Sequence, residues 1–258
     1  MAEDRKAPLA VVTGGASGIG EAAARRFAAD GWRVVIVDLN VERGEAIAAE
    51  LGAEFQKLDV SDEAAVAALV EDVTGRLGAP AAVVNSGGLL QNATRITTMP
   101  IEEFDRIQQV NVRGTLLVGR EFAKKMAEVG SGSIINLGSM TTYQPWPQPG
   151  YAVSKTSVKM LTEIMAAELG PQGVRVNAVA PGFTLTPAMK GRIERGERDP
   201  AQILARSALG RMVEPSEVAE AIFFLCSPLA SAITGVVLPV DAGWLVRSTY
   251  LTAAAQPA

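Results

Sequence analysis

Tyr151 and Lys155 are the two residues of this sequence best suited to move a proton. They lie four positions apart in Tyr151-Ala152-Val153-Ser154-Lys155, at the start of a predicted helix, so their side chains share one helix face. A free tyrosine has a pKa near ~10, and lowering it to about 7 requires roughly 4 kcal/mol. A lysine ammonium about 4 Å away supplies about that much at an effective dielectric of ~20. The pair therefore predicts a phenolate base, although the spacing alone more often marks a surface pair.

The residues that the chain lacks narrow the chemistry further. The 258-residue sequence has no histidine and a single cysteine, Cys226. Ser-His-Asp and Cys-His mechanisms and histidine-ligated metals are thereby excluded, and one cysteine forms neither an internal disulfide nor a thiolate cage. Cys226 follows the apolar run Ile222-Phe223-Phe224-Leu225 and is expected to be inert core. Acid–base chemistry must therefore use Tyr, Lys, Asp or Glu, and we expect no metal site.

Composition and charge are those of an ordinary globular chain. Hydrophobic residues make up 48%, charged residues 20%, and the net charge is −4. The chain carries no basic signature of a nucleic-acid binder, and no apolar run approaches the ~18 residues of a membrane span. The charged start Met1–Lys6 does not resemble a secretory signal. We expect a cytoplasmic protein with neither nucleic-acid nor membrane partners.

A glycine-rich loop follows the first predicted strand and leads into a predicted helix. Its sequence is Thr13-Gly14-Gly15-Ala16-Ser17-Gly18-Ile19-Gly20. Glycines let the backbone approach a pyrophosphate, and the helix N-terminus supplies free N–H groups and a positive dipole. The alternative is a glycine-rich turn without a ligand, which the strand–loop–helix context disfavours. The expected cofactor-binding residues of this loop are Gly14, Ser17, Gly18, Ile19 and Gly20.

Asp38 ends the second predicted strand, 20 residues after Gly18 (38 − 18 = 20). A carboxylate at this position accepts hydrogen bonds from an adenosine ribose and repels a 2′-phosphate. Neither the loop from Gly14 to Gly20 nor the following Leu39 and Asn40 adds a cation. These residues favour NAD over NADP, with Asp38 and Leu39 at the adenosine end. The alternative is a solvent-facing aspartate in an ordinary turn.

The elements that must position these residues alternate between short β-branched runs and longer Ala-, Glu- and Leu-rich stretches. Strands are expected at Leu9–Val12, Arg33–Val37, Phe55–Leu58, Ala81–Val84, Ser133–Leu137, Val174–Val179 and Val236–Val240. Helices are expected at about 18–30, 41–51, 63–77, 101–129 and 151–168, the third with Ser61 as its N-cap.

This alternation predicts an α/β fold. Near-continuous apolar strands are typical of a parallel sheet covered on both faces, so we expect a doubly wound (Rossmann) sheet of about seven strands with helices on both sides. No linker divides the chain, and residues 1–258 are expected to form a single domain. An irregular segment at about 183–211 is typical of a substrate lid. We expect most charges of its stretch Lys190–Asp199 to face solvent.

Several weak motifs occur in a fixed order along the chain. They are Thr13–Gly20, Leu58-Asp59-Val60, Asn85-Ser86-Gly87-Gly88, Asn111, Ser139, Tyr151–Lys155 and Pro181-Gly182. In this order and combination the chain resembles the classical-type short-chain dehydrogenase/reductase family from about Leu9 to Gly243. The resemblance implies a Rossmann-fold oxidoreductase that transfers a hydride between a nicotinamide cofactor and a CH–OH group.

The resemblance also implies roles for individual residues. The catalytic set would be Asn111, Ser139, Tyr151 and Lys155, with Tyr151 as general acid/base and Ser139 on the substrate oxygen. Lys155 would hold the nicotinamide ribose and lower the Tyr151 pKa, and Asn111 would position Lys155 through an ordered water. The remaining cofactor contacts implied by the resemblance are Asp59, Val60, Asn85, Gly87, Pro181, Gly182, Thr184 and Thr186.

Two segments depart from the family pattern. Ser139 and Tyr151 are 12 positions apart (151 − 139 = 12), one fewer than the commonest spacing, and the stretch between them is rich in proline. If this loop displaces Ser139, Thr141 is the nearest substitute hydroxyl. In Asn85-Ser86-Gly87-Gly88 the family more often has Asn-Asn-Ala-Gly, a change expected to adjust packing only.

The substrate is the least determined part of the prediction. The expected wall contains Trp146, Phe183 and Met189 as apolar surfaces, with Thr141 and Gln144 as polar contacts. We expect NAD-dependent oxidation of a secondary alcohol. A sugar or polyol is favoured because Gly138-Ser139-Met140 and Pro147-Gln148-Pro149 resemble the corresponding stretch of some polyol and sugar dehydrogenases of the family. Three alternatives stay open: an NADP-linked ketone or 3-oxoacyl reductase of the same family, a non-catalytic dinucleotide-binding protein, and an S-adenosylmethionine methyltransferase.

Resemblance also implies a homodimer or homotetramer, formed through the helices that carry Asn111 and Tyr151. The C-terminal tail, about 244–258, is too apolar to be free in solvent. It is expected to pack at a subunit interface near a neighbour's site.

Overall fold

A seven-stranded, all-parallel sheet organises the chain, in a computed structural model that describes residues 7–254. The strand order is β3-β2-β1-β4-β5-β6-β7, so the direction of winding reverses between β1 and β4. The strands are β1 (Leu9–Thr13), β2 (Arg33–Asp38), β3 (Glu54–Lys57), β4 (Ala82–Asn85), β5 (Gly132–Leu137), β6 (Val174–Pro181) and β7 (Val237–Val240). The expected doubly wound parallel sheet is therefore confirmed, with strand bounds within two residues of those predicted.

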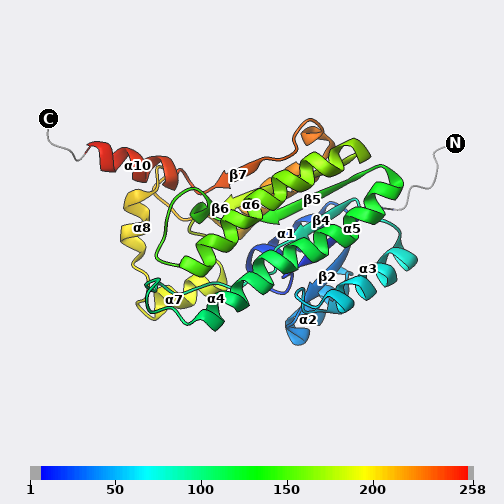
Figure 1. The fold of residues 1–258 in the computed structure, drawn as a ribbon, viewed down its shortest axis with the longest axis horizontal. Helices are drawn as coiled ribbons and strands as arrows, with labels where there is room; N and C mark the ends of the chain where they lie inside the picture. The colour runs from blue at the N-terminus through cyan, green and yellow to red at the C-terminus, as the bar shows by residue number, and fades with distance from the viewer. Residues whose placement is uncertain (1–6, 255–258) are drawn as a thin grey trace.

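Two apolar layers cover the sheet because alternate residues of each strand point to opposite faces. Ala10 and Val12 of β1 pack with α1 (Gly18–Ala29), α2 (Val41–Leu51) and α9 (Pro215–Cys226). Leu9 and Val11 pack with α3 (Glu63–Leu77), α5 (Thr115–Val129) and α6 (Pro149–Leu169). Figure 1 labels α1, α2, α3, α5 and α6 beside the strands. Burial on both faces explains the apolar strand sequences, and Cys226 is part of the first layer.

The long helix expected at 101–129 is interrupted where Asn111 lies. It comprises α4 (Ile101–Gln108), a π-helical segment (Gln109–Gly114) and α5. A π-helical turn adds a residue to the helix and is frequent at functional sites. At this turn Gly114 packs against Val60, where an added Cβ would lie 2.7 Å from the valine side chain. The apolar period of the sequence does not reveal this local insertion.

Helix α3 begins as predicted but with a different cap. The Asp62 side chain accepts a hydrogen bond from the Ala65 N–H at 3.0 Å, whereas the Ser61 hydroxyl donates to Asp59 at 2.7 Å. The prediction of Ser61 as N-cap was therefore wrong. The carboxylate adjacent to the helix takes the capping position because an anion there also meets the positive helix end.

Three of the helices that follow β6 lie at one end of the molecule. Helices α7 (Pro187–Glu194) and α8 (Pro200–Arg206) form the segment expected as a lid, and α10 (Trp244–Ala254) forms the tail. Figure 1 shows all three at one end of the long axis, away from α2 and α3. Every helix within residues 7–254 is too short or too polar to span a lipid bilayer.

Candidate active site

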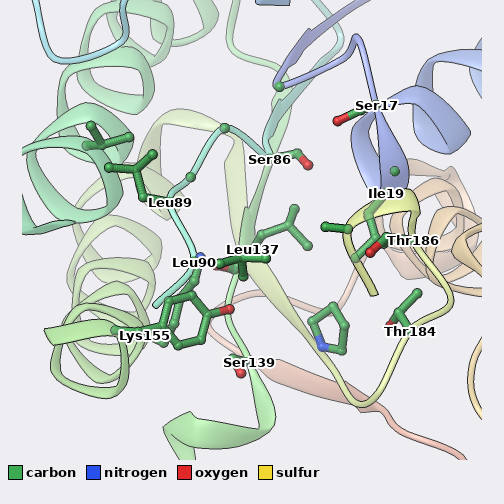
Figure 2. A pocket seen from close by; sticks show the side chains of 18 of the residues that line it. Ser17, Ile19, Ser86, Leu89, Leu90, Leu137, Ser139, Lys155, Thr184 and Thr186 are labelled. Atoms are coloured by element: carbon green, nitrogen blue, oxygen red, sulfur yellow. The ribbon is translucent and has the colours of Figure 1, made fainter. Parts of the chain in front are cut away.

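A cavity of about 690 Å³ opens at the carboxyl ends of β1, β2, β4, β5 and β6. This edge of a doubly wound sheet is where ligands bind, beside the point at which the strand order reverses. The glycine loop, Asp38, Tyr151 and residues of α7 all line this cavity. Figure 2 shows Lys155 and Ser139 on one side, with Thr184 and Thr186 across from them. The structure thus brings together residues that are up to 184 positions apart in the sequence (198 − 14 = 184).

The glycine loop leaves no room for a side chain at Gly14 or Gly20. A Cβ added to Gly20 would lie 2.1 Å from the Gly14 carbonyl oxygen, and one added to Gly14 would lie 2.7 Å from the Gly87 nitrogen. Gly14 and Gly18 also have positive φ values of 65° and 56°, which side chains rarely adopt. Ser17, the N-cap of α1, makes no side-chain capping hydrogen bond to any described residue. The loop and the start of α1 therefore form a cradle that fits a pyrophosphate.

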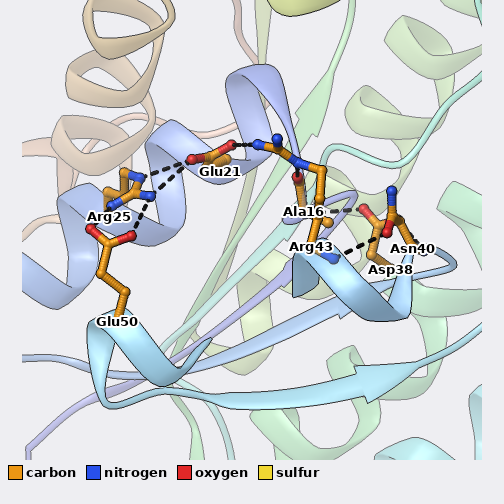
Figure 3. A network of polar contacts seen from close by, with 7 residues as sticks. All are labelled: Ala16, Glu21, Arg25, Asp38, Asn40, Arg43 and Glu50. Atoms are coloured by element: carbon orange, nitrogen blue, oxygen red, sulfur yellow. Dashed lines mark hydrogen bonds and ion pairs between the residues drawn. The ribbon is translucent and has the colours of Figure 1, made fainter. Parts of the chain in front are cut away.

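Asp38 is fixed between this loop and the start of α2. One carboxylate oxygen accepts from the Ala16 N–H at 3.0 Å and the other from the Asn40 N–H at 2.9 Å. The nearby Arg43 donates to the Ala16 carbonyl at 2.9 Å and to Glu21 at 2.8 Å. Figure 3 shows this network. The cavity edge at β2 therefore presents a carboxylate, and the neighbouring cation is already paired.

Tyr151, Lys155 and Ser139 meet at the opposite end of the cavity. Tyr151 and Lys155 lie one turn apart near the start of α6, which begins at Pro149, a residue suited to the first helical position. Ser139 follows β5, and its hydroxyl accepts from the Thr141 N–H at 3.2 Å. The Lys155 Nζ donates to the Leu137 carbonyl at 2.7 Å and lies 5.6 Å from the centre of the Tyr151 ring. The shortened loop before Tyr151 leaves Ser139 in the cavity wall.

The protonation of the pair differs from the sequence-based expectation. Burial raises the pKa of Tyr151 above its ordinary value, while the Ser139 hydroxyl and the Arg192 charge lower it. Burial also lowers the pKa of Lys155 to about 8. Lys155 is not among the groups that lower the Tyr151 pKa here, and its amine is held on the Leu137 carbonyl. That Lys155 lowers the Tyr151 pKa together with a bound nicotinamide stays a prediction.

Asn111 lies behind the cavity wall, with 1% of its surface exposed. Its side chain accepts from the Leu89 N–H at 2.7 Å and donates to the Leu89 carbonyl at 3.0 Å and the Ser154 hydroxyl at 3.1 Å. A Cβ on Gly88 would lie 3.2 Å from the Asn111 oxygen and 3.8 Å from the Lys155 nitrogen, so the two side chains are close. In this arrangement the Asn111 amide fixes the loop after β4 to α6.

Most of the other predicted site residues line the cavity. These are Gly14, Ser17, Gly18, Ile19, Asp38, Leu39, Asp59, Val60, Gly87, Thr141, Trp146, Pro181, Gly182, Phe183, Thr184, Thr186 and Met189. Asn85 does not, because its amide donates to Asn136 at 2.8 Å inside the sheet. Gln144 lies in a separate shallow groove beside Tyr143. The Tyr143 hydroxyl donates a hydrogen bond to the Val237 carbonyl. Gly20 packs beneath the loop.

Arg106, Gln109 and Val110 line the cavity although the sequence did not single them out. Ser86, Leu90, Gln148, Arg192 and Arg198 line it as well. Most charges of Lys190–Asp199 are exposed, as expected, and the two arginines are the exceptions. The charge pattern of Lys190–Asp199 contains no signal for which side of α7 covers the cavity, since the helix lacks an apolar stripe.

Three aromatic rings form the apolar end of the wall. Trp146 lies 6.0 Å from Phe183 and 5.4 Å from Trp244, and Phe183 lies 5.5 Å from Trp244, all in edge-to-face arrangements. Trp244 begins α10 and is buried. The tail therefore packs by this residue on its own chain's wall. Its expected packing at a subunit interface stays a prediction, and residues 255–258 lie outside the described part of the chain.

Comparison with known proteins assigns the family. The family model described as enoyl-(acyl carrier protein) reductase matches residues 14–245. The chain is 35% identical to D-threitol dehydrogenase of Mycolicibacterium smegmatis, over 93% of both proteins. The chain belongs to the short-chain dehydrogenase/reductase family. Members of this family are oxidoreductases, and the relatives found here act on alcohols, so this protein is an alcohol oxidoreductase with a small-molecule substrate.

Other relatives of this short-chain dehydrogenase/reductase differ in substrate and cofactor. It is 38% identical to galactitol 2-dehydrogenase (L-tagatose-forming) of Cereibacter sphaeroides, covering 92% of this chain and 94% of that protein. It is 36% identical to cis-4-hydroxycyclohexanecarboxylate dehydrogenase of Sinomonas cyclohexanicum, covering 92% and 96%. A solved structure titled "ElxO with NADP Bound" has a TM-score of 0.89 at 28% identity, covering 93% and 100%. The family thus includes a protein that binds NADP.

Proposed function

We propose that this enzyme oxidises a secondary alcohol to its ketone with NAD, using Tyr151 as the general base. The observation that carries the proposal is one cavity lined by both a dinucleotide cradle and the Tyr151–Lys155–Ser139 group, in a chain without histidine. A non-catalytic dinucleotide-binding protein or a methyltransferase has no need of the second group.

The proposed chemistry assigns one task to each side chain. The Tyr151 phenolate accepts the hydroxyl proton of the alcohol while the Ser139 hydroxyl donates a hydrogen bond to the substrate oxygen. A bound oxidised nicotinamide would supply the hydride acceptor for the carbinol carbon and a positive charge beside Tyr151. Because burial raises the pKa of Tyr151, that added charge is what makes the phenolate accessible. Lys155 holds the nicotinamide ribose and passes the proton that Tyr151 has accepted toward solvent.

The preference for NAD rests on the charges around Asp38. A 2′-phosphate at the β2 edge would meet the Asp38 carboxylate, and Arg43 is already paired with Glu21. The ribose of NAD instead offers hydroxyl donors to the same carboxylate. We assign Leu39, Asp59 and Val60 to the adenosine end of the cofactor. The proposed contacts to the phosphates and nicotinamide are Gly14, Ser17, Gly18, Ile19, Gly87, Pro181, Gly182, Thr184 and Thr186.

A polyhydroxylated substrate agrees with the wall next to Ser139. The Thr141 hydroxyl is buried, lines the cavity and has no hydrogen-bond partner among the described residues. Such a group is expected to be satisfied by a ligand or water. Trp146, Phe183 and Met189 offer the ring surfaces and apolar contacts that the CH faces of a sugar or cyclic alcohol require. Relatives named for threitol and galactitol support this substrate class.

Cofactor and reaction are tested together by initial rates. Purified enzyme is assayed with NAD and with NADP against sugars, polyols and cyclic secondary alcohols, with NADH or NADPH formation as the readout. We expect turnover with NAD and a kcat/KM for NADP at least about tenfold lower, since one lost charged hydrogen bond is worth ~1.5–3 kcal/mol. Equal or better turnover with NADP would contradict the assignment of Asp38.

A homodimer or homotetramer is proposed as well. Val153, Met160 and Ile164 on the outward side of α6 are about half exposed, an unusual apolar surface for a monomer. Light scattering after size exclusion is expected to give two or four chains, and a monomer at micromolar concentration would contradict it.

A further inference from the structure

Arg192 on α7 stands out among the lid charges because its side chain is only 15% exposed and faces the cavity. Its guanidinium donates to the Asn92 side chain at 2.8 Å and to the Gln91 carbonyl at 3.5 Å, both neutral acceptors. Glu197, the nearest carboxylate, lies 4.0 Å away and is held by two hydrogen bonds from Arg195. Within the described residues, the one ion pair of Arg192 is therefore this long contact with Glu197.

The position of Arg192 is at the substrate end of the cavity. Gln91, whose carbonyl it contacts, accepts a hydrogen bond from the Tyr151 N–H at 3.1 Å through its side chain. Thr186, at the start of α7, instead packs against the loop glycine Gly18. Arg192 is six positions after Thr186, a distance of about 9 Å along a helix. Arg192 therefore lies toward Tyr151, away from the pyrophosphate cradle, and its charge is one of those that lower the Tyr151 pKa.

The acidic side chains of the cavity wall lie far from Arg192. Within the described residues, the acidic side chains that line it are Asp38 and Asp59, both at the adenosine end. Arg106, beside Asp59, is a lining cation at that end, whereas Lys155 and Arg192 line the other end and Arg198 is a second lid cation in the wall. Arg198 makes no ion pair within 4.0 Å with any residue that the structure describes. A part-buried guanidinium is costly unless an anion joins it, and its planar fork matches carboxylate and phosphate oxygens.

We propose that Arg192, assisted by Arg198, binds an anionic group of the alcohol substrate, either a carboxylate or a phosphate ester. This inference rests on the proposed function, since it names the class of alcohol that the Tyr151 site takes. The substrate is then a hydroxy acid, a sugar acid or a phosphorylated polyol, with its reacting hydroxyl at Tyr151 and its anion under α7.

A binding experiment tests the proposal without requiring turnover. Calorimetric titrations use cyclohexanecarboxylate, cyclohexyl phosphate and the neutral cyclohexanecarboxamide, with and without NADH. We expect one of the two anions to bind at least about tenfold more tightly than the amide, and Arg192→Met to remove most of that difference. The anion that binds more tightly identifies carboxylate or phosphate as the group recognised. Equal binding of the amide and both anions by the native enzyme would overturn the proposal.

Two control variants separate this site from other roles of the lid. Arg195→Met removes the same charge from an exposed residue of the same segment, and Asn92→Ala removes the contact that ties Arg192 to the loop after β4. Both are expected to keep the preference for anions. The proposal is overturned if Asn92→Ala loses the preference for anions as fully as Arg192→Met. The role of Arg192 would then be to hold α7 on the loop after β4, and not to bind the anion. A weakened affinity of Arg192→Met for NADH by the same factor would also overturn it, since the arginine would then serve the cofactor.

A parallel kinetic comparison links the site to catalysis. The ratio of kcat/KM for 4-hydroxycyclohexanecarboxylate over its primary amide is expected to fall about 10- to 100-fold in Arg192→Met. Retention of this ratio would contradict the proposal. If no alcohol is oxidised but anion binding depends on Arg192 as described, the proposed reaction fails while the anion site stands.

Discussion

Lys155 presents a test of how burial of its amine makes the stability of the folded enzyme depend on pH. Its amine is buried and its pKa is lowered to about 8, against an ordinary value of 10.5. The folded state therefore releases a proton that the unfolded chain retains between these values, so native stability should rise with pH across this range. At pH 7 the difference corresponds to about 3 kcal/mol of destabilisation, and at pH 9.5 to roughly 1.5 kcal/mol.

Replacing Lys155 by methionine removes this pH-dependent term. The variant also leaves the Leu137 carbonyl without its donor, at a cost of about 1–3 kcal/mol that does not depend on pH. The stability difference between variant and native enzyme should therefore shift by about 2 kcal/mol against the variant between pH 7 and pH 9.5. For a chain of this size that is a change of about 4–8 °C in the difference between the two Tm values. Dehydrogenase activity should be lost at both pH values.

The assay is thermal unfolding of the cofactor-free proteins at the two pH values. Lys159→Met is the matched control, since Lys159 lies one turn later on α6 in a surface pair with Glu163. Its Tm difference from the native enzyme should be small at both pH values. A Tm difference for Lys155→Met that is the same at pH 7 and pH 9.5 would refute the reasoning, because the lysine would then be charged and well solvated.

Four further predictions concern the base and the cofactor cradle. Tyr151→Phe should lower kcat about 10²- to 10⁴-fold with little change in the Kd for NAD. Because burial raises the Tyr151 pKa, alcohol oxidation by the native enzyme should increase with pH beyond neutrality, whereas ketone reduction should persist at lower pH; rate profiles in both directions check this. Asp38→Ser should reduce kcat/KM for NAD about 10- to 100-fold and narrow the gap to NADP, measured by initial rates. Gly20→Ala should abolish NAD binding in titrations because its methyl would overlap the Gly14 carbonyl, whereas Gly75→Ala, in open space on α3, should raise the Tm slightly.

The sheet was predictable because its pattern is local and redundant. Apolar runs such as Val34-Val35-Ile36-Val37 have no polar face, and such strands fit only a sheet that helices cover on both sides. The glycine loop and the pair Tyr151–Lys155 were predictable for a related reason. In each case the residues that carry the chemistry lie within a few positions of one another in the sequence.

Features that depend on tertiary contacts were not predictable in the same way. The π-helical turn at Asn111 forms where Gly114 meets Val60 and the Asn111 amide binds the Leu89 backbone. The side of α7 that presents Arg192 depends on how the lid rests on the loop after β4. The raised pKa of Tyr151 reflects burial, which the spacing to Lys155 does not contain. Each requires knowledge of what packs against the residue.

Single-turnover formation of NADH tests most directly whether Tyr151 is the base that makes hydride transfer possible. Enzyme saturated with NAD is mixed with an alcohol substrate over a range of pH, for native enzyme and Tyr151→Phe. We predict a burst of NADH in the native enzyme whose rate rises with pH, and no burst in the variant despite normal NAD affinity. A variant that forms NADH at the native rate would contradict the account.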